Sequence, residues 1–240
     1  MEAQAVIISG GMGGIGKAAA LAFAERGWQV CVLYHQTASD EAEAFAQTLG
    51  DGHLALPCDI TDPQATASAV MRAKKRFGRL DAAIHAAVGP LLRVQPTKMT
   101  TDQFKSQFEV TVFGGFNFFK AAVGEFHQSE GGSLLGITSA ALQEHAPAMS
   151  AYLCAKAALK QLLYELHAEL APRVRVNAVA PAFVPTSLHA DLPAPVLHFM
   201  KERLPNQTTP EAVAQVIFDV CTSPQRGLSF SVPSAPPVAL

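Results

Sequence analysis

The sequence predicts an α/β fold built on one doubly wound parallel sheet. Short, nearly continuous apolar runs alternate with longer helix-like stretches along the whole chain, a pattern typical of parallel strands that are buried on both faces. The chain has 240 residues, of which 49% are hydrophobic and 16% charged, so it can bury a large core without disulfides or metals. Crossovers between parallel strands are right-handed, which places helices on both faces of the sheet.

The predicted strands are the apolar runs, and each is followed by a glycine turn or a polar loop. They cover residues 5–8, 30–33, 53–56, 82–84, 133–137, 174–179 and 228–232. No linker or shift in composition divides the chain. One domain over residues 1–240 is therefore expected.

The predicted helices occupy the stretches between these runs, at 15–26, 39–49, 100–126, 150–170 and 209–221. A further helix is predicted to begin at Asp62-Pro63. Pro63 stands at a first-turn position, where its missing N–H costs nothing. Thr100 and Gln103 form a capping box. Residues 181–208 contain several prolines and interrupt the alternation, so we expect them to form a lid over a substrate site.

Composition argues against several function classes. The formal net charge is −2 with no block of like charges, so neither nucleic acid nor an anionic membrane is an expected partner. No apolar stretch is long enough to span a bilayer, and the N-terminus lacks the features of a signal peptide. The four cysteines form no CxxC pair and the eight histidines no HExxH, so we expect no metal site. The default expectation is a soluble cytoplasmic protein.

A glycine-rich turn links the first predicted strand to the first predicted helix, from Ser9 to Gly16. Unpaired N–H groups and the positive dipole end of a helix attract a pyrophosphate, and glycines let it approach closely. Two fingerprints overlap, one on glycines 11, 13 and 16 and one on glycines 10, 14 and 16. The turn predicts dinucleotide binding. The alternative is a turn with a purely geometric role.

The end of the second strand bears on the choice between NAD and NADP. An acid there would bind the ribose hydroxyl of NAD and repel a 2′-phosphate, but the sequence reads Tyr34-His35-Gln36-Thr37. Lys17, His35, Thr37 and Ser39 could hold the phosphate, so the sequence favours NADP. The alternative is that they are ordinary polar loop residues.

Tyr152 and Lys156 are four residues apart, which places them on one face of a predicted helix. A nearby ammonium lowers the pKa of a phenol, so that tyrosine can act as an acid or base toward a carbonyl or alcohol oxygen. Ser139 follows the fifth strand, where its hydroxyl could bind that oxygen. The alternative is a packed tyrosine beside a lysine that extends to solvent.

Together these motifs resemble the short-chain dehydrogenase/reductase family. The resemblance covers about residues 4–190 and rests on the glycine turn, Asp59, the Ser139-Tyr152-Lys156 set and the run 176–181. It implies a single Rossmann-like domain, an NAD(P)(H)-dependent oxidoreductase and a small-molecule carbonyl or alcohol substrate. It also implies a homo-dimer or homo-tetramer. The stretch 33–45 is similar to NADP-using members that reduce 3-oxoacyl groups.

The resemblance also implies residue roles. Tyr152 would be the acid/base, Lys156 would bind the nicotinamide ribose and tune Tyr152, and Ser139 would hold the substrate. Asp59 would bind adenine and Thr186 the carboxamide. The full set of implied cofactor contacts is Gly10, Gly14, Ile15, Gly16, His35, Asp59, Ile60, Ala86, Tyr152, Lys156, Pro181, Val184 and Thr186.

Four positions depart from the family pattern. The expected Asn-Asn-Ala-Gly is His85-Ala86-Ala87-Val88, the expected catalytic asparagine is Thr111, and Pro-Gly is Pro181-Ala182. The C-terminal Val-Asp-Gly-Gly is replaced by the run 232–235. Thr111 is therefore expected to serve as a weaker substitute in the proton relay.

Three functions are weighed. The leading one is a reductase of a ketone or 3-oxoacyl-type substrate, and the second is a catalytically silent NADPH-binding or scaffold protein. A serine hydrolase using Ser139 lacks the Gly-x-Ser-x-Gly elbow. Candidate substrate-pocket residues are Leu91, Leu92, Gln143, His145, Phe183 and His189.

Overall fold

The computed structural model describes residues 3–127, 130–143, 147–189, 192, 194–195, 198, 207–233 and 237–240. The strands are β1 (Ala5–Ser9), β2 (Gln29–Tyr34), β3 (Leu54–Pro57), β4 (Ala82–His85), β5 (Gly132–Ile137), β6 (Val174–Pro181), β7 (Leu228–Val232) and β8 (Val238–Ala239). The helices are α1 (Gly14–Ala24), α2 (Ser39–Thr48), α3 (Pro63–Phe77), α4 (Thr101–Phe108), α5 (Gly115–Glu125), α6 (Ser150–Leu170) and α8 (Pro210–Thr222), with short helical turns η1 (Pro96–Lys98), η2 (Glu109–Gly114), η3 (Ala140–Gln143) and η4 (Ser187–His189).

The strands form one sheet in the order β3-β2-β1-β4-β5-β6-β7-β8. Strands β1 to β7 are parallel, and β8 pairs antiparallel with β7. The order reverses between β1 and β4, which is where α/β sheets of this kind open a crevice for ligands. The predicted doubly wound parallel sheet is confirmed. The two-residue strand β8 was not predicted, because so short a strand has no readable pattern.

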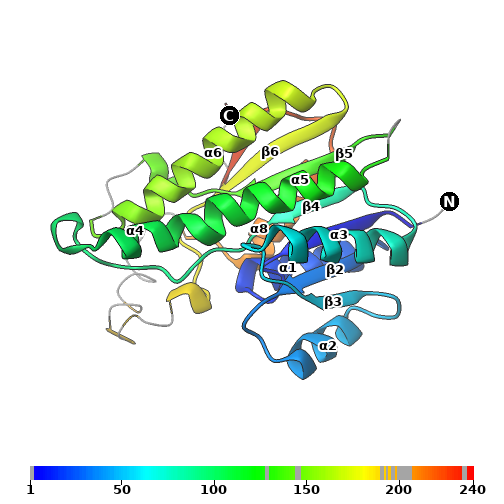
Figure 1. The fold of residues 1–240 in the computed structure, drawn as a ribbon, viewed down its shortest axis with the longest axis horizontal. Helices are drawn as coiled ribbons and strands as arrows, with labels where there is room; N and C mark the ends of the chain where they lie inside the picture. Colours follow the sequence, from blue (N-terminus) through cyan, green and yellow to red (C-terminus); the bar gives the residue numbers. More distant parts are fainter. Residues whose placement is uncertain are drawn as a thin grey trace.

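Helices cover both faces of the sheet. Ala5 and Ile7 of β1 point into a core with α3, α5 and α6, whereas Val6 and Ile8 point into a core with α1 and α8. Figure 1 shows α3, α5 and α6 in front of the sheet and α1 and α8 behind it. Because both faces are covered, every residue of β1 is buried, which explains why the strands read as continuous apolar runs.

The long helix predicted from Thr100 to Phe126 is divided into α4, a π-helical turn η2 and α5. Its predicted capping box is confirmed, with Gln103 N–H donating to Thr100 Oγ1 at 3.2 Å. The imidazole of His85 reaches the backbone carbonyl of Thr111 inside η2 at 3.1 Å. A side chain that inserts into the hydrogen-bond ladder of a helix is a known cause of such bulges.

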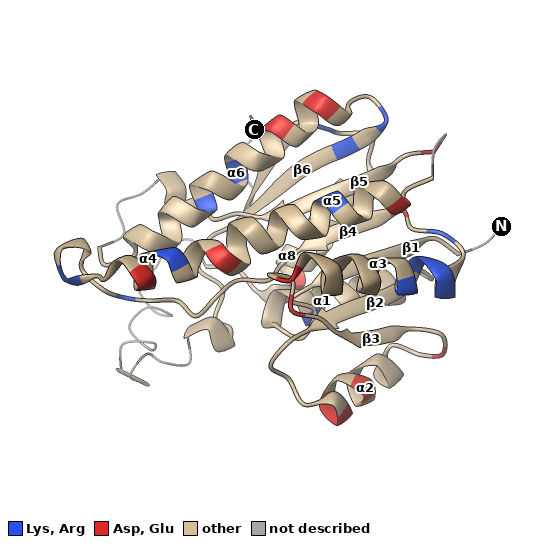
Figure 2. Ribbon diagram, in the orientation of Figure 1, with Lys and Arg blue, Asp and Glu red and all other residues tan. Residues whose placement is uncertain are grey.

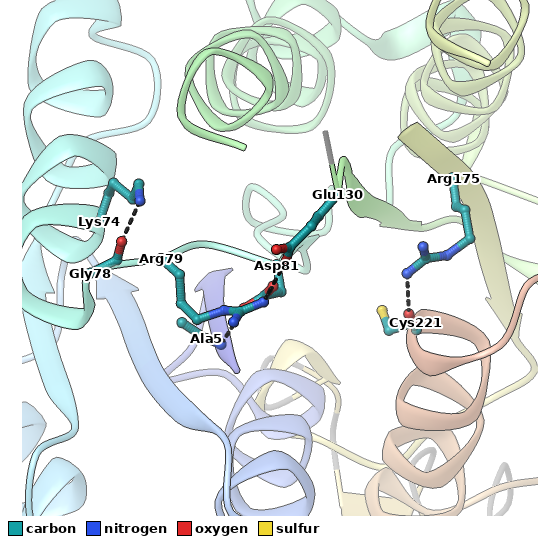
Figure 3. Close-up of polar contacts among 8 residues, drawn as sticks. All are labelled: Ala5, Lys74, Gly78, Arg79, Asp81, Glu130, Arg175 and Cys221. Carbon is teal, nitrogen blue, oxygen red and sulfur yellow. Dashed lines mark hydrogen bonds and ion pairs between the residues drawn. The ribbon is translucent and has the colours of Figure 1, made fainter. Parts of the chain in front are cut away.

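The amino edge of the sheet is closed by polar contacts. The carboxylate of Asp81 accepts from the N–H of Ala5 at 2.8 Å and from Nε of Arg79 at 2.8 Å. Arg79 also pairs with Glu130 at 3.0 Å. Figure 3 shows this cluster beside two contacts that cap helix ends, Lys74 with the Gly78 carbonyl and Arg175 with the Cys221 carbonyl. The opposite, carboxyl edge is where a cavity opens.

Charged residues lie mainly on helices and loops and are nearly absent from the strands (Figure 2). Among the described residues, no helix is long and apolar enough to cross a membrane. In the same part of the chain no cluster of three or more His, Cys, Asp or Glu side chains could hold a metal ion.

Candidate active site

A cavity of about 300 Å³ opens at the carboxyl edge of the sheet. Its walls come from the start of α1, the loops after β4, β5 and β6, and the first two turns of α6. The lining residues used below are Ile15, Ala86, Arg93, Ile137, Ser139, Tyr152, Lys156, Pro181, Val184, Thr186 and His189. One concave site therefore joins the glycine turn to the predicted Ser-Tyr-Lys set.

The glycine turn is packed so tightly that side chains are excluded. Gly10 has φ +67°, and a Cβ there would lie 2.6 Å from the backbone of Ala87. A Cβ on Gly16 would lie 2.2 Å from the carbonyl oxygen of Gly10. Both positions therefore require glycine, which supports the fingerprint on glycines 10, 14 and 16.

The start of α1 has the properties of a phosphate site. Its N-cap, Gly13, makes no side-chain capping bond, and no acid stands in its first turn. Asp62, Thr100 and Thr209 cap the starts of α3, α4 and α8, whereas α2 and α6, like α1, start without a side-chain cap. The first N–H groups of α1 are thus left for an anion, and these residues fit the pyrophosphate of a dinucleotide.

Ser139 and Tyr152 meet in the cavity wall. Tyr152 is 9% exposed, and burial raises the pKa of its phenol, while a hydrogen bond with the Ser139 hydroxyl and the charge of Arg93 lower it less. The expectation that an ammonium would lower this pKa is wrong for the structure as described. The desolvation of the phenolate outweighs the charges around it.

Lys156 lies one helical turn after Tyr152 and is almost fully buried. Its Nζ donates to the carbonyl of Ile137 at 2.6 Å and lies 5.8 Å from the Tyr152 ring centroid. Burial lowers the pKa of Lys156 to about 8. The ammonium is therefore directed at the end of β5.

Comparison with known proteins agrees with this site. A family model described as enoyl-(acyl carrier protein) reductase matches residues 10–229. The protein named uncharacterized oxidoreductase YhdF of Bacillus subtilis (strain 168) is 30% identical over 78% of this chain and 65% of its own length. The 3-oxoacyl-[acyl-carrier-protein] reductase of Synechocystis is 29% identical over 93% of this chain and 91% of its own.

A solved structure shows the same fold. The 3-ketoacyl-(acyl-carrier-protein) reductase of Brucella melitensis, complexed with NADH, superposes with a TM-score of 0.86 at 22% identity and covers 96% of this chain and 97% of its own. The chain belongs to the short-chain dehydrogenase/reductase family. It is therefore an NAD(P)-dependent oxidoreductase acting on CH–OH or C=O groups.

The structure gathers most of the nicotinamide-side residues that the family resemblance implies. Besides Ser139, Tyr152 and Lys156, the cavity is lined by Ile15, Ala86, Pro181, Val184 and Thr186. Thr186 lies directly over the turn, since a Cβ on Gly14 would be 2.5 Å from its methyl group. Of the lid predicted at 181–208, the structure describes residues 181–189, 192, 194–195, 198 and 207–208, so the lid itself stays a prediction.

The residues that the family resemblance implies for the adenine end of the cofactor lie apart from the cavity, after β2 and β3. Asp59 accepts from the N–H and the hydroxyl of Thr61 at 2.9 and 2.7 Å, and these bonds lower the pKa of its carboxyl. His35 Nε2 stands 3.8 Å from the other carboxylate oxygen. Ile60 is buried, and its carbonyl accepts from Asn117 at 3.1 Å.

Thr111, which stands where the family resemblance implies an asparagine, does not line the cavity and is 1% exposed. Its carbonyl accepts from Nε2 of His85, whose Nδ1 faces the Ser9 hydroxyl at 2.8 Å. Because a carbonyl only accepts, the imidazole proton must sit on Nε2. Two of the departures from the family, His85 and Thr111, are thus in direct contact.

The substrate half of the cavity contains residues that sequence reasoning missed. Arg93 lines it, and its only sequence signal is a cation after the apolar run 90–92. Of the predicted pocket residues, Leu91, Phe183 and His189 line the cavity, whereas Leu92 does not. Gln143 lines a neighbouring cavity of about 360 Å³, and His145 lies outside the described residues.

Proposed function

We propose that this protein is an NADPH-dependent reductase of a ketone or 3-oxoacyl-type substrate that uses Ser139, Tyr152 and Lys156. The observation that carries the proposal is the hydrogen-bonded Ser139–Tyr152 pair in the wall of a cavity that begins at the glycine turn. In this proposal Tyr152 would be the proton donor, Ser139 would bind the substrate oxygen, and the glycine turn would bind the dinucleotide beside the same cavity.

The overall reaction would convert the ketone, NADPH and one proton into the alcohol and NADP. Bound NADPH supplies the hydride to the carbonyl carbon. The Ser139 hydroxyl would hold the carbonyl oxygen, and the Tyr152 phenol would give it a proton as negative charge develops. Lys156 would then stabilise the phenolate that remains. The raised pKa of Tyr152 keeps the phenol protonated at neutral pH, the state that reduction needs.

Exchanging Tyr152 for phenylalanine tests the assignment. Tyr152→Phe should lower kcat on any ketone that the native protein reduces by at least about 100-fold, because the general acid is lost. The Kd for NADPH, measured by calorimetry, should change little. Tyr164→Phe is the matched control, since Tyr164 lies on the same helix but is exposed. A Tyr152→Phe variant with near-native kcat would refute the proposal.

The proposed preference for NADPH rests on the loop after β2, where no acid would repel a 2′-phosphate. Lys17 pairs with Glu41 at 3.2 Å, whereas the contact of His35 with Asp59 is longer, at 3.8 Å, so His35 is the candidate phosphate ligand that is less tightly held by an acid. The side chain of His35 is 60% exposed, whereas Tyr34 is buried. His35→Asp should therefore favour NADH in calorimetric titrations. Tighter native binding of NADH than of NADPH would contradict the preference.

A catalytically silent NADPH-binding protein is the second candidate, and one observation favours it. His85 bonds the Thr111 carbonyl in the helix where the family pattern expects the relay asparagine. This candidate predicts tight NADPH binding with no turnover of ketones or 3-oxoacyl thioesters. A screen of such substrates with NADPH and NADH distinguishes the two functions.

A homo-dimer or homo-tetramer is proposed on the exposed aromatic side chains that Phe104, Phe113, Phe116 and Tyr164 present from α4, η2, α5 and α6. Apolar side chains grouped on helices in this way favour burial against a second copy. Light scattering should report a dimer or larger, and Phe113→Glu should shift it toward the monomer.

A further inference from the structure

A second cavity, of about 360 Å³, adjoins the first at the carboxyl edge of the sheet. The two cavities share Thr138 and Ser139, but the second continues along η3, α6 and β7 instead of toward the glycine turn. Its volume lies within the usual range for sites that bind small molecules. The proposed reduction uses no residue of this cavity except Ser139, so the remainder of its wall requires a separate explanation.

The wall of the second cavity combines hydrogen-bonding groups with small aliphatic surfaces. Among its described lining residues none is acidic, and the apolar ones include Leu142 and Leu240. The polar lining residues are Thr138, Ser139, Gln143, Lys160, Gln161 and Ser229. A wall with a cation and no described acid favours a ligand that carries negative charge.

Lys160 supplies the positive charge of this wall. It lies on α6 one helical turn after Lys156 and is partly buried. Lys156 donates to the Ile137 carbonyl, whereas no residue in the described part of the chain accepts a hydrogen bond from the Lys160 ammonium or forms an ion pair with it. Partial burial of an unpaired ammonium costs free energy, which a bound anion would offset.

The polar side chains around Lys160 also leave hydrogen-bonding capacity for a ligand. The amide of Gln161 donates to Glu165 at 2.6 Å, and Glu165 does not line the cavity. Within the described residues, the side chains of Gln143 and Ser229 make no hydrogen bond to the protein. An amide and a hydroxyl can both donate to an anion that the ammonium attracts.

The second cavity is also connected to the active site through the turn η3. This turn begins directly after Ser139, and the N–H of Ala141 donates to the Ser139 hydroxyl oxygen at 3.3 Å. Leu142 and Gln143, at the end of the same turn, line the second cavity. A ligand there would therefore contact the turn that holds the Ser139 hydroxyl.

We propose that the second cavity binds a small organic carboxylate, with Lys160 as its counter-ion and the Gln143 amide as a further donor. Leu142 and Leu240 would contact the hydrocarbon part of the ligand. In a partly enclosed cavity the attraction between ammonium and carboxylate is screened less than in bulk water. The inference goes beyond the proposed function, because this ligand lies outside the cavity of Tyr152 and is not reduced.

The test uses saturated monocarboxylates of two to six carbon atoms, each paired with its primary amide, and inorganic phosphate. They are titrated by calorimetry into protein saturated with dinucleotide, because the glycine turn would also attract anions. At least one carboxylate should bind at least about tenfold more tightly than its amide. Lys160→Met should remove this difference and leave the Kd of the dinucleotide unchanged. Lys75→Met, which removes an exposed lysine of α3, is the matched control and should change neither.

Two further variants separate the charge and the amide from general damage to the fold. Lys160→Arg keeps the positive charge and should retain carboxylate binding within about threefold, unlike Lys160→Met. Gln143→Leu removes the amide donor and should weaken carboxylate binding by a smaller factor than Lys160→Met does.

Several results would overturn the inference. These are carboxylate binding that Lys160→Met leaves unchanged, equal binding of every acid and its amide, and tighter binding of inorganic phosphate than of any carboxylate. Native protein that binds no carboxylate would also overturn it. None of these measurements requires turnover, so the carboxylate site can be supported even if no ketone is reduced. Turnover of ketones without carboxylate binding would leave the reductase function standing and refute the second site.

Discussion

Replacing His85 tests whether its hydrogen bond to the Thr111 carbonyl, which joins two positions that depart from the family pattern, stabilises the fold. The imidazole is 1% exposed and links Ser9 of β1 to the Thr111 carbonyl of η2. An asparagine places its amide near the Nδ1 position, whereas the amide nitrogen of a glutamine reaches the Nε2 position. His85→Asn should therefore deprive the buried Thr111 carbonyl of its imidazole donor and lower the free energy of unfolding by about 1–3 kcal/mol. His85→Gln can keep that bond and should cost less.

The same residue gives a pH dependence with a definite sign. Burial first, and the charge of Lys156 second, lower the pKa of His85 from 6.5 to about 3. Below pH 6.5 the unfolded chain takes up a proton that the folded protein excludes. The free energy of unfolding therefore has its full value, with respect to His85, above pH 6.5. It decreases as the pH falls toward 3, by about 1.4 kcal/mol per pH unit. By pH 5 the loss is about 2 kcal/mol.

The assay is urea unfolding followed by circular dichroism at pH 7 and pH 5. Both His85 variants lack the titrating imidazole, so each should lose about 2 kcal/mol less than the native protein between the two pH values. Ser9→Ala keeps the imidazole and should retain the native pH dependence. Equal losses in all four proteins would show that His85 is not held neutral by the fold. Equal stability of His85→Asn and His85→Gln at pH 7 would show that the Thr111 bond contributes nothing.

Three further outcomes are expected. Gly10→Ala should destabilise the protein by about 2–4 kcal/mol and abolish NADPH binding in a calorimetric titration, because its Cβ would overlap the Ala87 backbone at a positive φ; Gly124→Ala, in open space, is the control. Because burial raises the pKa of Tyr152, alcohol oxidation should still accelerate as the pH passes the usual tyrosine value of about 10, while ketone reduction stays constant near neutrality; an oxidation rate already level at pH 8 would contradict this. Thr111→Asn should raise kcat or leave it unchanged with little effect on KM, and comparing the solvent isotope effects of the two proteins would show whether proton transfer changed; a strong fall in kcat would mean that Thr111 has a role of its own.

The sequence by itself determined the layered α/β architecture and the succession of strands and helices along the chain. These follow from local patterns, since a strand buried on both faces needs an unbroken apolar run such as the one at 5–8. Helix starts were equally readable, because Thr100 and Gln103 cap a helix through contacts three residues apart. The pairing of Tyr152 with Lys156 on one helix face is local for the same reason.

Only the tertiary structure decided the electrostatics and the substrate half of the site. The direction of the Tyr152 pKa depends on burial by distant segments, which no local pattern reports. The contact of His85 with Thr111 and that of Arg93 with His189 join residues 26 and 96 positions apart. Such contacts depend on which loops the sheet brings to one edge, and side-chain direction there is set by packing rather than by a periodic sequence.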